Sequence, residues 1–381
     1  MNTTVIMQHK SLTKQLKIEH NKETNTVVNF SKLNSSAENH NSVEKRSSDD
    51  LASREAVSKS VKSSEPPIIK AQNAEHLFNE DVGVRDLTFY VPRGVIFGLV
   101  GPSGSGKTTT IRLLSGMYKP TSGSVQVLDQ APNHFSSRAR ENIGYMPQHF
   151  VLYPMLSVAE NLNFVASLYG MGYFKRRKRS KTLLRFVELD RVRDRLASRL
   201  SGGMQRRLQL ACALAHDPQL IFADEPTAGV DPVMRSKFWD HFRELRDEGR
   251  TLFVTTQYIG EIENCDIVAI IREGRMLYIN TPEELRRKAF GGDLIRLSVD
   301  PKRVVEAVHL LNNQSIVKDA RRSFGQPGLL LVSTDDAASS IPTLIAVLKE
   351  SKIDTQQAEK YAPPFDDVFI ELMKQDGGGD D

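Results

Sequence analysis

The sequence predicts an α/β protein built around a largely parallel sheet, and three observations support this prediction. Short apolar runs of the kind that form buried strands recur along the chain. Helix-like segments separate most of these runs, and a glycine-rich loop joins one of them to a helix. The expected strands are residues 84–91, 94–100, 220–223, 251–256 and 267–271.

A helical pattern occupies residues 151–199 throughout, which predicts a helical subdomain inserted at about residues 150–205. The α/β unit as a whole is expected over residues 71–290. Strand-like and helix-like segments then alternate in a small α+β accessory domain, expected over residues 291–375. A flexible tail is expected at residues 376–381, which end in glycines and aspartates.

The first 70 residues differ from the rest of the chain in composition. Residues 1–70 are rich in Ser, Asn, Lys, Glu and Thr and poor in aromatic side chains. Such a segment cannot bury enough apolar surface to offset the loss of chain entropy, so we expect a disordered tail. A targeting role for this tail is the alternative interpretation.

The bulk composition limits the classes of function. The chain has 381 residues, of which 39% are hydrophobic, so it can form two domains with a sizeable core. The formal net charge of +4 is small for this length, and a nucleic-acid partner is not expected. Cys212 and Cys265 have no ligand spacing around them, which argues against a zinc site or a disulfide framework. Without a spanning apolar run or a signal-peptide pattern, a cytoplasmic location is expected.

A basic run, KRRKRSK, lies at residues 175–181 within the helical region. A solvated helix face is the favoured interpretation, because runs of charge this short are most often solvent-exposed. Nucleic-acid binding and a surface close to anionic lipid headgroups are the two functional alternatives.

A phosphate-binding loop is the clearest motif in the chain. Residues 101–108 read GPSGSGKT, directly after an expected strand and before an expected helix. Glycines let the loop backbone turn its N–H groups toward phosphate, and the helix start adds a positive dipole end. Lysine and threonine at the end of the motif are placed for the β- and γ-phosphates and for Mg²⁺. The predicted nucleotide-binding residues here are Gly101, Pro102, Ser103, Gly104, Ser105, Gly106, Lys107, Thr108 and Thr109.

An acidic pair follows another expected strand, at residues 220–223. Asp224 ends this strand and is placed to hold Mg²⁺, while Glu225 is placed to polarise a water that attacks the γ-phosphate. An acidic pair after a strand can also be a plain surface feature. The phosphate loop upstream makes the catalytic interpretation the preferred one.

A second helix start suited to an anion occurs at residues 200–208, LSGGMQRRL. Together with the phosphate loop, the acidic pair, YMPQ at 145–148 and VTTQ at 254–257, its order and spacing resemble the ATP-binding subunit of an ABC transporter. The resemblance covers about residues 75–290. It implies that residues 200–208 are the signature sequence of this family. It also implies that two such domains pair head to tail, so that the signature of each domain closes over the ATP held by the other. Ser201, Gly202 and Gly203 would then contact a γ-phosphate across the interface.

The resemblance also implies roles for single residues. Gln148 matches the glutamine that touches Mg²⁺ and reports the nucleotide state, and Asp231 matches the aspartate that crosses the dimer interface. Phe78 matches an aromatic residue that stacks on adenine, although it is equally suited to a core position. The implied cofactors are ATP and Mg²⁺, with Thr108, Gln148 and Asp224 as the metal-binding residues.

One position departs from the family pattern. Where the family has a histidine that hydrogen-bonds the γ-phosphate, this chain has Gln257. A glutamine amide donates a hydrogen bond but cannot become cationic or shuttle a proton. Because Glu225 is retained, we expect hydrolysis to survive, with Lys107, Glu225 and Gln257 as the catalytic residues.

The C-terminal segment at residues 363–374 resembles that of ATPases serving exporters with separate membrane subunits. The implied function is an Mg-dependent ATPase that powers a separately encoded permease for export of a drug, a lipid or a polysaccharide. The implied partners are that permease and a second ABC ATPase domain, either an identical copy or a paralogue, at the cytoplasmic face of the membrane. The alternatives are a nucleotide-sensing regulator with low turnover and a soluble ABC ATPase without a transport role.

Overall fold

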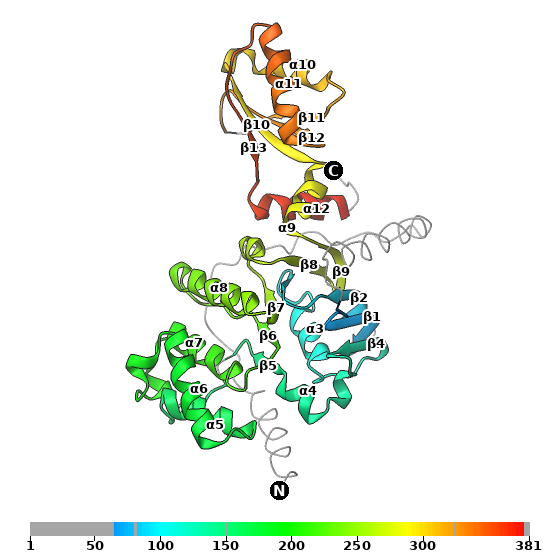
Figure 1. Cartoon of the computed structure of the whole chain (residues 1–381). Helices are drawn as coiled ribbons and strands as arrows, with labels where there is room; N and C mark the ends of the chain where they lie inside the picture. The colour runs from blue at the N-terminus through cyan, green and yellow to red at the C-terminus, as the bar shows by residue number, and fades with distance from the viewer. Residues whose placement is uncertain (1–64, 80–81, 150, 324, 377–381) are drawn as a thin grey trace, which may run out of the picture. The chain divides into compact units, whose positions relative to one another are not determined.

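The computed structural model describes residues 65–79, 82–149, 151–323 and 325–376 (Figure 1). The expected N-terminal tail therefore lies outside the described residues up to position 64, and the last five residues of the chain lie outside them as well. No helix among the described residues is long and apolar enough to cross a bilayer.

A six-stranded sheet forms the centre of the α/β unit, in the order β5-β6-β7-β3-β8-β9. All neighbouring pairs in this sheet are parallel except β8 and β9, as the apolar runs predict. Parallel strands buried on both faces need continuous apolar sequence, and β3, β6 and β7 are buried along their whole length. Its strands are β3 (Ile96–Val100), β5 (Ile143–Met146), β6 (Leu220–Asp224), β7 (Thr251–Thr256), β8 (Ile267–Arg272) and β9 (Arg275–Asn280).

A second sheet of three antiparallel strands has the order β2-β1-β4. Its strands are β1 (Ile69–Leu77), β2 (Gly83–Val91) and β4 (Ser122–Val127). Helix α3 (Lys107–Leu114) contributes Ile111, Leu113 and Leu114 to the core between this sheet and the large one. Two short helical segments, η1 (Pro132–His134) and α4 (Ser137–Glu141), connect β4 to β5.

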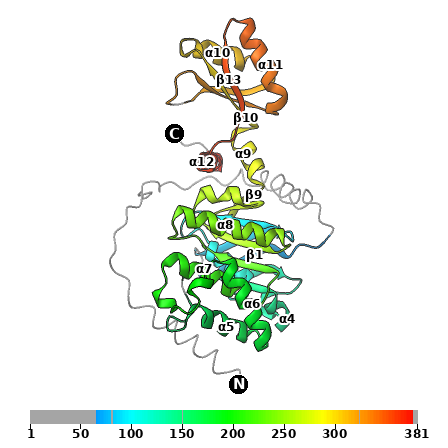
Figure 2. The ribbon, with the colours of Figure 1, turned by 60° about the vertical axis from the view of Figure 1, so that its left-hand side comes forward.

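Helices cover the other face of the large sheet and form a second core. Figure 2 shows α8 lying across this face, with α5, α6 and α7 grouped beyond it. These helices are α5 (Val158–Leu168), α6 (Tyr173–Phe186), α7 (Gly202–Ala213) and α8 (Pro232–Asp247), with the 3-10 segments η2 (Asp190–Val192), η3 (Ala197–Arg199) and η4 (Ile259–Asn264). Helices α5 and α6 lie within the range expected for the helical subdomain, whereas α7 continues past its expected limit at residue 205.

The C-terminal unit has the chain order βαββαβ, with the sheet order β11-β12-β10-β13. This is the split βαβ arrangement of ferredoxin-like domains, with a core of its own between the sheet and two helices. Its elements are β10 (Asp293–Val299), η5 (Pro301–Arg303), α10 (Val304–Asn312), β11 (Val317–Arg322), β12 (Leu329–Thr334), α11 (Ala337–Glu350) and β13 (Thr355–Tyr361). It is preceded by α9 (Pro282–Phe290) and followed by α12 (Phe365–Asp376).

Two expected domain boundaries differ from the elements in the structure. The expected tail ends at residue 70, but β1 already begins at Ile69, so this boundary cuts the strand. Ile68 and Ile69 are both buried. The boundary at residue 375 assigns α12 to the small domain, yet Phe365, Val368 and Leu372 belong to the core of the α/β unit. Apolar burial, which sequence composition alone does not locate, is the reason for both differences.

Candidate nucleotide-binding site

The phosphate loop joins β3 to α3 at the carboxyl edge of the large sheet. Gly104 and Gly106 have φ angles of 80° and 105°, a region that favours glycine. The Lys107 ammonium donates to the carbonyl oxygens of Gly101 and Pro102, each at 3.0 Å, so it folds back over the loop. The Ser105 hydroxyl is buried without a hydrogen-bond partner among the described residues. A curled loop with a buried ammonium at a helix start is an anion-binding arrangement.

The acidic pair lies beside this loop, because β7 alone separates β6 from β3. Thr108 Oγ1 donates to Asp224 Oδ1 at 3.3 Å, and Thr255 Oγ1 donates to the same oxygen at 2.7 Å. Lys107 Nζ lies 3.3 Å from Glu225 Oε1, and both side chains are buried. Glu225 has a φ of 45°, a strained conformation for a residue with a side chain, which its N–H bond to Thr255 Oγ1 at 3.0 Å helps to hold.

Gln148 reaches the same edge from the segment after β5. Its Nε2 atom donates to Glu225 Oε2 at 3.0 Å. Thus the structure brings together Lys107, Thr108, Gln148, Asp224 and Glu225, which we call the phosphate-loop edge. The hydroxyl of Thr108 and the carboxylate of Asp224, two of the three predicted metal-binding residues, are oxygen ligands of the kind that Mg²⁺ prefers.

Two side chains of α7 hold the backbone on either side of Gln148. Arg206 Nη1 donates to the Pro147 carbonyl at 3.1 Å, and Gln209 Nε2 donates to the His149 carbonyl at 2.8 Å. Burial lowers the pKa of Arg206, partly offset by the charges of the acidic pair. Sequence analysis did not single out these two residues, since nothing local marks their distant backbone partners.

Gln257 follows β7 and is exposed, and its position is set by its neighbours. Thr256 Oγ1 accepts from the Tyr258 N–H at 3.0 Å and donates to Glu261 Oε2 at 2.5 Å. Glu261 is only 4% exposed, and its other oxygen accepts from Thr227 Oγ1 at 2.6 Å. A buried carboxylate therefore joins the segment that contains Gln257 to the loop that follows the acidic pair. Sequence analysis missed Glu261 because its burial is not apparent from the sequence.

The same carboxylate reaches the start of α8. Arg235 Nε lies 3.3 Å from Glu261 Oε1, and the Arg235 guanidinium lies 4.1 Å from the centre of the Tyr258 ring. Asp231 caps this helix by accepting from the Met234 N–H at 3.0 Å. The segments that contain Gln257 and Asp231 are thus held by one buried group.

Ser201, Gly202, Gly203 and Asp231 form a separate group, which we call the signature edge. Ser201 caps α7, and its hydroxyl accepts from the Met204 N–H at 3.4 Å. A Cβ atom on Gly203 would lie 3.5 Å from Met234 Cγ, so the starts of α7 and α8 are neighbours. A Cβ atom on Gly202 would meet nothing within 4 Å in the described chain. In Figure 1, α7 lies with α5 and α6, apart from α3 of the phosphate loop.

Phe78 follows β1 and is 53% exposed, so it is not a core residue. It forms edge contacts with His76, at a ring-centroid distance of 4.8 Å, and with Tyr118, at 5.4 Å. His76 and Tyr118 stack on each other at 4.5 Å. A held aromatic side chain with an exposed ring is suited to stacking on a base.

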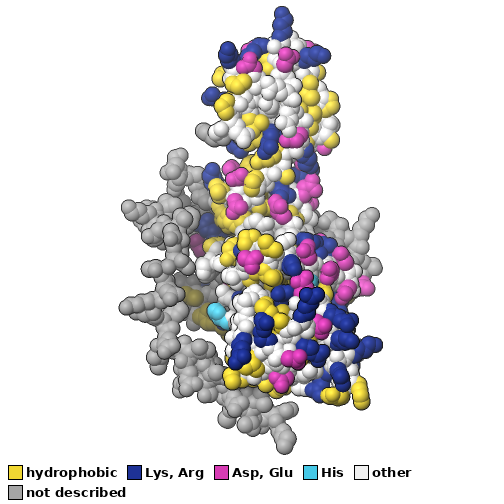
Figure 3. All heavy atoms as spheres, turned by 90° about the vertical axis from the view of Figure 1, so that its left-hand side faces the viewer, with side chains coloured by type: hydrophobic (Ala, Val, Ile, Leu, Met, Phe, Trp, Pro, Cys, Tyr) yellow, Lys and Arg dark blue, Asp and Glu magenta, His cyan; other side chains and the backbone are white. Residues whose placement is uncertain are grey.

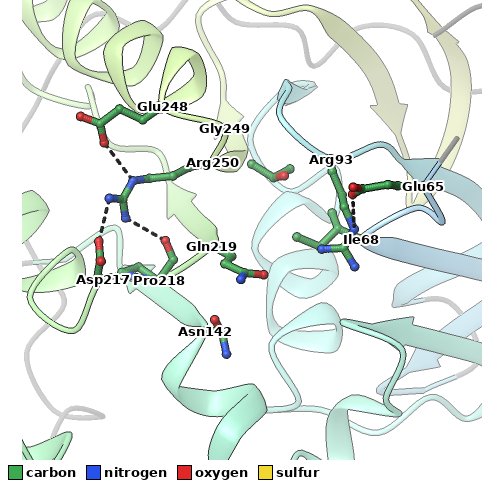
Figure 4. Close-up of a pocket in the computed structure, with 11 residues that line it drawn as sticks. Glu65, Ile68, Arg93, Asn142, Asp217, Pro218, Gln219, Glu248, Gly249 and Arg250 are labelled. Carbon is green, nitrogen blue, oxygen red and sulfur yellow. Dashed lines mark hydrogen bonds and ion pairs between the residues drawn. The ribbon is translucent and has the colours of Figure 1, made fainter. Parts of the chain in front are cut away.

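A polar hollow of about 520 Å³ lies at the opposite end of the large sheet (Figure 4). Arg250 donates to Asp217 at 2.7 Å and to Glu248 at 3.2 Å, and Arg93 lies 3.6 Å from Glu65. These arginines already face carboxylates, so the hollow is not organised for a phosphate. It is separate from the predicted nucleotide site.

The phosphate loop, the acidic pair and Gln148 lie together at the carboxyl edge of the sheet. This arrangement defines a nucleotide-binding domain of the phosphate-loop class. A second helix start, on a helical subdomain, distinguishes it within that class. Residues 84–228 match the family model described as ABC transporter. The chain belongs to the ABC transporter ATP-binding proteins, and the predicted family and α/β fold class are confirmed.

Relatives show how far the likeness extends. The daunorubicin resistance ATP-binding protein DrrA3 of Streptomyces coeruleorubidus is 31% identical, over 81% of this chain and 96% of that protein. The "Probable multidrug ABC transporter ATP-binding protein YbhF" of Escherichia coli (strain K12) is 36% identical, over 58% of this chain but only 38% of that protein. The dimeric post-hydrolysis structure of the ATP-binding cassette MJ0796 bound to ADP and Pi has a TM-score of 0.52 at 27% identity, over 56% of this chain and 98% of that one.

Proposed function

We propose that this chain is an Mg-dependent ATPase that powers a separately encoded export permease through pairing of two ATPase domains. The observation that supports it most is the convergence of Lys107, Asp224, Glu225 and Gln148 on the phosphate-loop edge. One buried ammonium and two carboxylates are the groups needed to hold a triphosphate and to activate water.

In this mechanism ATP changes the partners of Lys107 and Glu225. Lys107 leaves the loop carbonyls and Glu225 Oε1 for the β- and γ-phosphates, a stronger charge pairing. Glu225 Oε1 is then free to accept a proton from the attacking water, while Gln148 still orients the other oxygen. Thr108 and Asp224 would hold Mg²⁺, which neutralises phosphate charge when bound. Gln257 would donate a hydrogen bond to a γ-phosphate oxygen.

Pairing explains the glycines of the signature edge. Gly202 is exposed, and a Cβ there would meet no atom within 4 Å among the described residues. The absence of a side chain is therefore not required by packing within the chain, but it leaves the N–H groups of α7 open to a phosphate from outside. We assign that phosphate to ATP held by a second ABC ATPase domain, an identical copy or a paralogue. Asp231 would cross the same interface, and Phe78 would stack on adenine.

The permease would dock on the helical subdomain. Large apolar side chains are exposed soon after Gln148, with Met155 77% exposed. Clusters of exposed apolar side chains mark sites of protein contact, and α7 connects this segment to the signature edge through Arg206 and Gln209. Docking here would place the chain at the cytoplasmic face of the membrane. The exposed set is Val151, Tyr153, Met155 and Phe164.

The Glu225→Gln variant tests this function. Hydrolysis should fall about a thousandfold while ATP binding is kept, because an amide cannot take the proton of water. Size-exclusion chromatography with Mg-ATP should show dimer for Glu225→Gln and monomer for the double variant Glu225→Gln/Lys107→Ala. Native chain with no turnover when its permease is present would favour the nucleotide-sensing alternative. A Glu225→Gln variant that hydrolyses ATP at the native rate would contradict the proposed mechanism.

A further inference from the structure

Helix α6 has an unusual charge distribution. It contains no acidic residue and seven basic ones: Lys175, Arg176, Arg177, Lys178, Arg179, Lys181 and Arg185. Its buried side is formed by Ser180, Leu183 and Leu184. Arg179 serves the fold, since it donates to the Leu214 carbonyl at 3.0 Å and to Asp217 at 2.9 Å.

The outer side of α6 has cations without counter-charges. Arg177, Lys178 and Lys181 are exposed, and none has a carboxylate within ion-pair distance among the described residues; we call these three residues the basic face. Arg177 and Lys181 are four positions apart, where like charges on a helix repel. No ion pair among the described residues offsets this repulsion, and an anionic partner would relieve it.

A hollow of about 180 Å³ opens beside the basic face, between α6, α5 and the turn after η2. Arg177, Lys181 and Arg193 line it together with the polar side chains of Asn163 and Ser180, and none of the described lining residues is acidic. Arg193 also lies 3.8 Å from Asp194, outside the lining, so Arg177 and Lys181 are the cations without an acidic partner among the described residues. The Ser180 hydroxyl donates to Asn163 Oδ1 at 3.3 Å, so the amide N–H₂ of Asn163 is not used in the bond to Ser180. Cations with nearby amide and hydroxyl groups in a hollow of this size suit a phosphate group.

Apolar side chains are exposed where α5 ends and α6 begins. Phe174 is 85% exposed and Tyr173 is 61% exposed in the first turn of α6, and Leu168 at the end of α5 is 68% exposed. Figure 3 shows many Lys and Arg side chains on the lower part of the molecule, with some Asp and Glu side chains among them and hydrophobic side chains at the lower margin. Aromatic rings beside cations are typical of a bilayer interface. Leu168 has no ring to stack on a base, which favours lipid over nucleic acid.

We propose that the basic face of α6 binds anionic phospholipid, with a headgroup phosphate in the hollow and Tyr173 and Phe174 at headgroup depth. This contact needs neither ATP nor a permease, so it is independent of the proposed transport function. It would add a direct membrane contact to the one made through the permease.

Vesicle flotation with the full chain tests this proposal. Vesicles of phosphatidylcholine with about a third phosphatidylglycerol should bind the chain, and phosphatidylcholine alone should not. Arg177→Ala/Lys181→Ala should weaken binding at least about tenfold, and Phe174→Ser by a smaller factor. Raising the salt concentration should release the chain, because these charges are exposed.

The matched control is Arg138→Ala/Arg140→Ala, which removes two exposed arginines from α4. It should keep native vesicle binding, and both double variants should keep the basal ATPase rate. Equal vesicle binding by native chain and Arg177→Ala/Lys181→Ala would overturn the proposal. So would binding of a short RNA that depends on Arg177 and Lys181 when no anionic vesicle is bound.

Discussion

The phosphate loop and the signature edge both contain a helix start of the kind that binds anions, yet their packing is opposite. A Cβ on Gly101 would lie 2.2 Å from the Ile271 carbonyl oxygen, and one on Gly106 would lie 2.7 Å from Val84 Cγ1. At the signature edge a Cβ on Gly202 would meet nothing within 4 Å in the part of the chain that the structure describes. Glycine at the first edge is required by the chain itself. In the proposed pairing, glycine at the second leaves room for a phosphate that approaches from outside, so this edge would be half of a site.

The strongest way to break the comparison is to disable the first edge. Lys107→Ala removes the buried ammonium, and two hydrogen bonds to charged phosphates should be lost with it. We expect ATP affinity to fall about a thousandfold, measured with a fluorescent nucleotide or by calorimetry. Native affinity in this variant would show that the loop does not hold the triphosphate.

Matched glycine substitutions sharpen the comparison directly. Gly101→Ala should lower the unfolding free energy by about 2 kcal/mol, because backbone must move to admit the new methyl group. Gly202→Ala should leave the melting temperature unchanged or slightly higher, since alanine favours helix and meets no neighbour. Its hydrolysis rate should still fall about thirtyfold because a methyl group would obstruct a phosphate from the partner.

Thermal unfolding and steady-state ATPase assays measure the two effects separately. If Gly202→Ala turned over ATP at the native rate, no partner phosphate would approach this helix start. A loss of stability in that variant would instead mean that packing explains the glycine.

Variants of Gln257 distinguish whether its side chain positions the γ-phosphate or transfers a proton in the proposed hydrolysis. If the side chain only donates a hydrogen bond, Gln257→Ala should slow hydrolysis about tenfold to a hundredfold, and Gln257→His should not accelerate it. ATPase rates of the three proteins, measured with the permease present, check this. Equal rates for native and Gln257→Ala proteins would exclude any role, and a faster histidine variant would favour proton transfer.

Glu261 joins the segments that contain Gln257 and Asp231, and the smallest expected effect concerns this link. Glu261→Gln should lower kcat about tenfold with little change in KM for ATP, because nucleotide contacts remain while Gln257 and Asp231 lose their shared support. In the background of Gln257→Ala the same change should cost less, since the two residues act together.

Glu263→Gln is the matched control, because Glu263 lies in the same turn but is half exposed and pairs with Arg286 on the surface. It should keep the native kcat. Additive losses from Glu261→Gln and Gln257→Ala, or a raised KM alone, would contradict the positioning role of Glu261.

Short stretches of sequence predicted the elements and motifs that depend only on neighbouring residues. The phosphate loop, the acidic pair and the apolar runs of β3, β6, β7 and β8 all lie where the pattern placed them. Strand β13 was not expected, because its sequence TQQAEKY is polar and mostly exposed and lacks the alternation of a half-buried strand. The bonds of Arg206 to Pro147 and of Glu261 to Thr227 join positions far apart in sequence, so only the fold reveals them.

Because α12 returns to the core of the α/β unit, the small C-terminal domain lies between two helices of that core in the chain. Helices α9 and α12 pack in the same core, and between them the chain leaves along β10 and returns along β13, which are neighbours in one sheet. The βαββαβ unit is therefore an insertion with adjacent ends rather than an appendage at the terminus. Truncating the chain after α9 would strip Phe365, Val368 and Leu372 from the core and expose apolar surface. An internal excision that rejoins α9 to α12 by a short linker would leave that core covered, so we expect that the inserted unit can be removed as one piece.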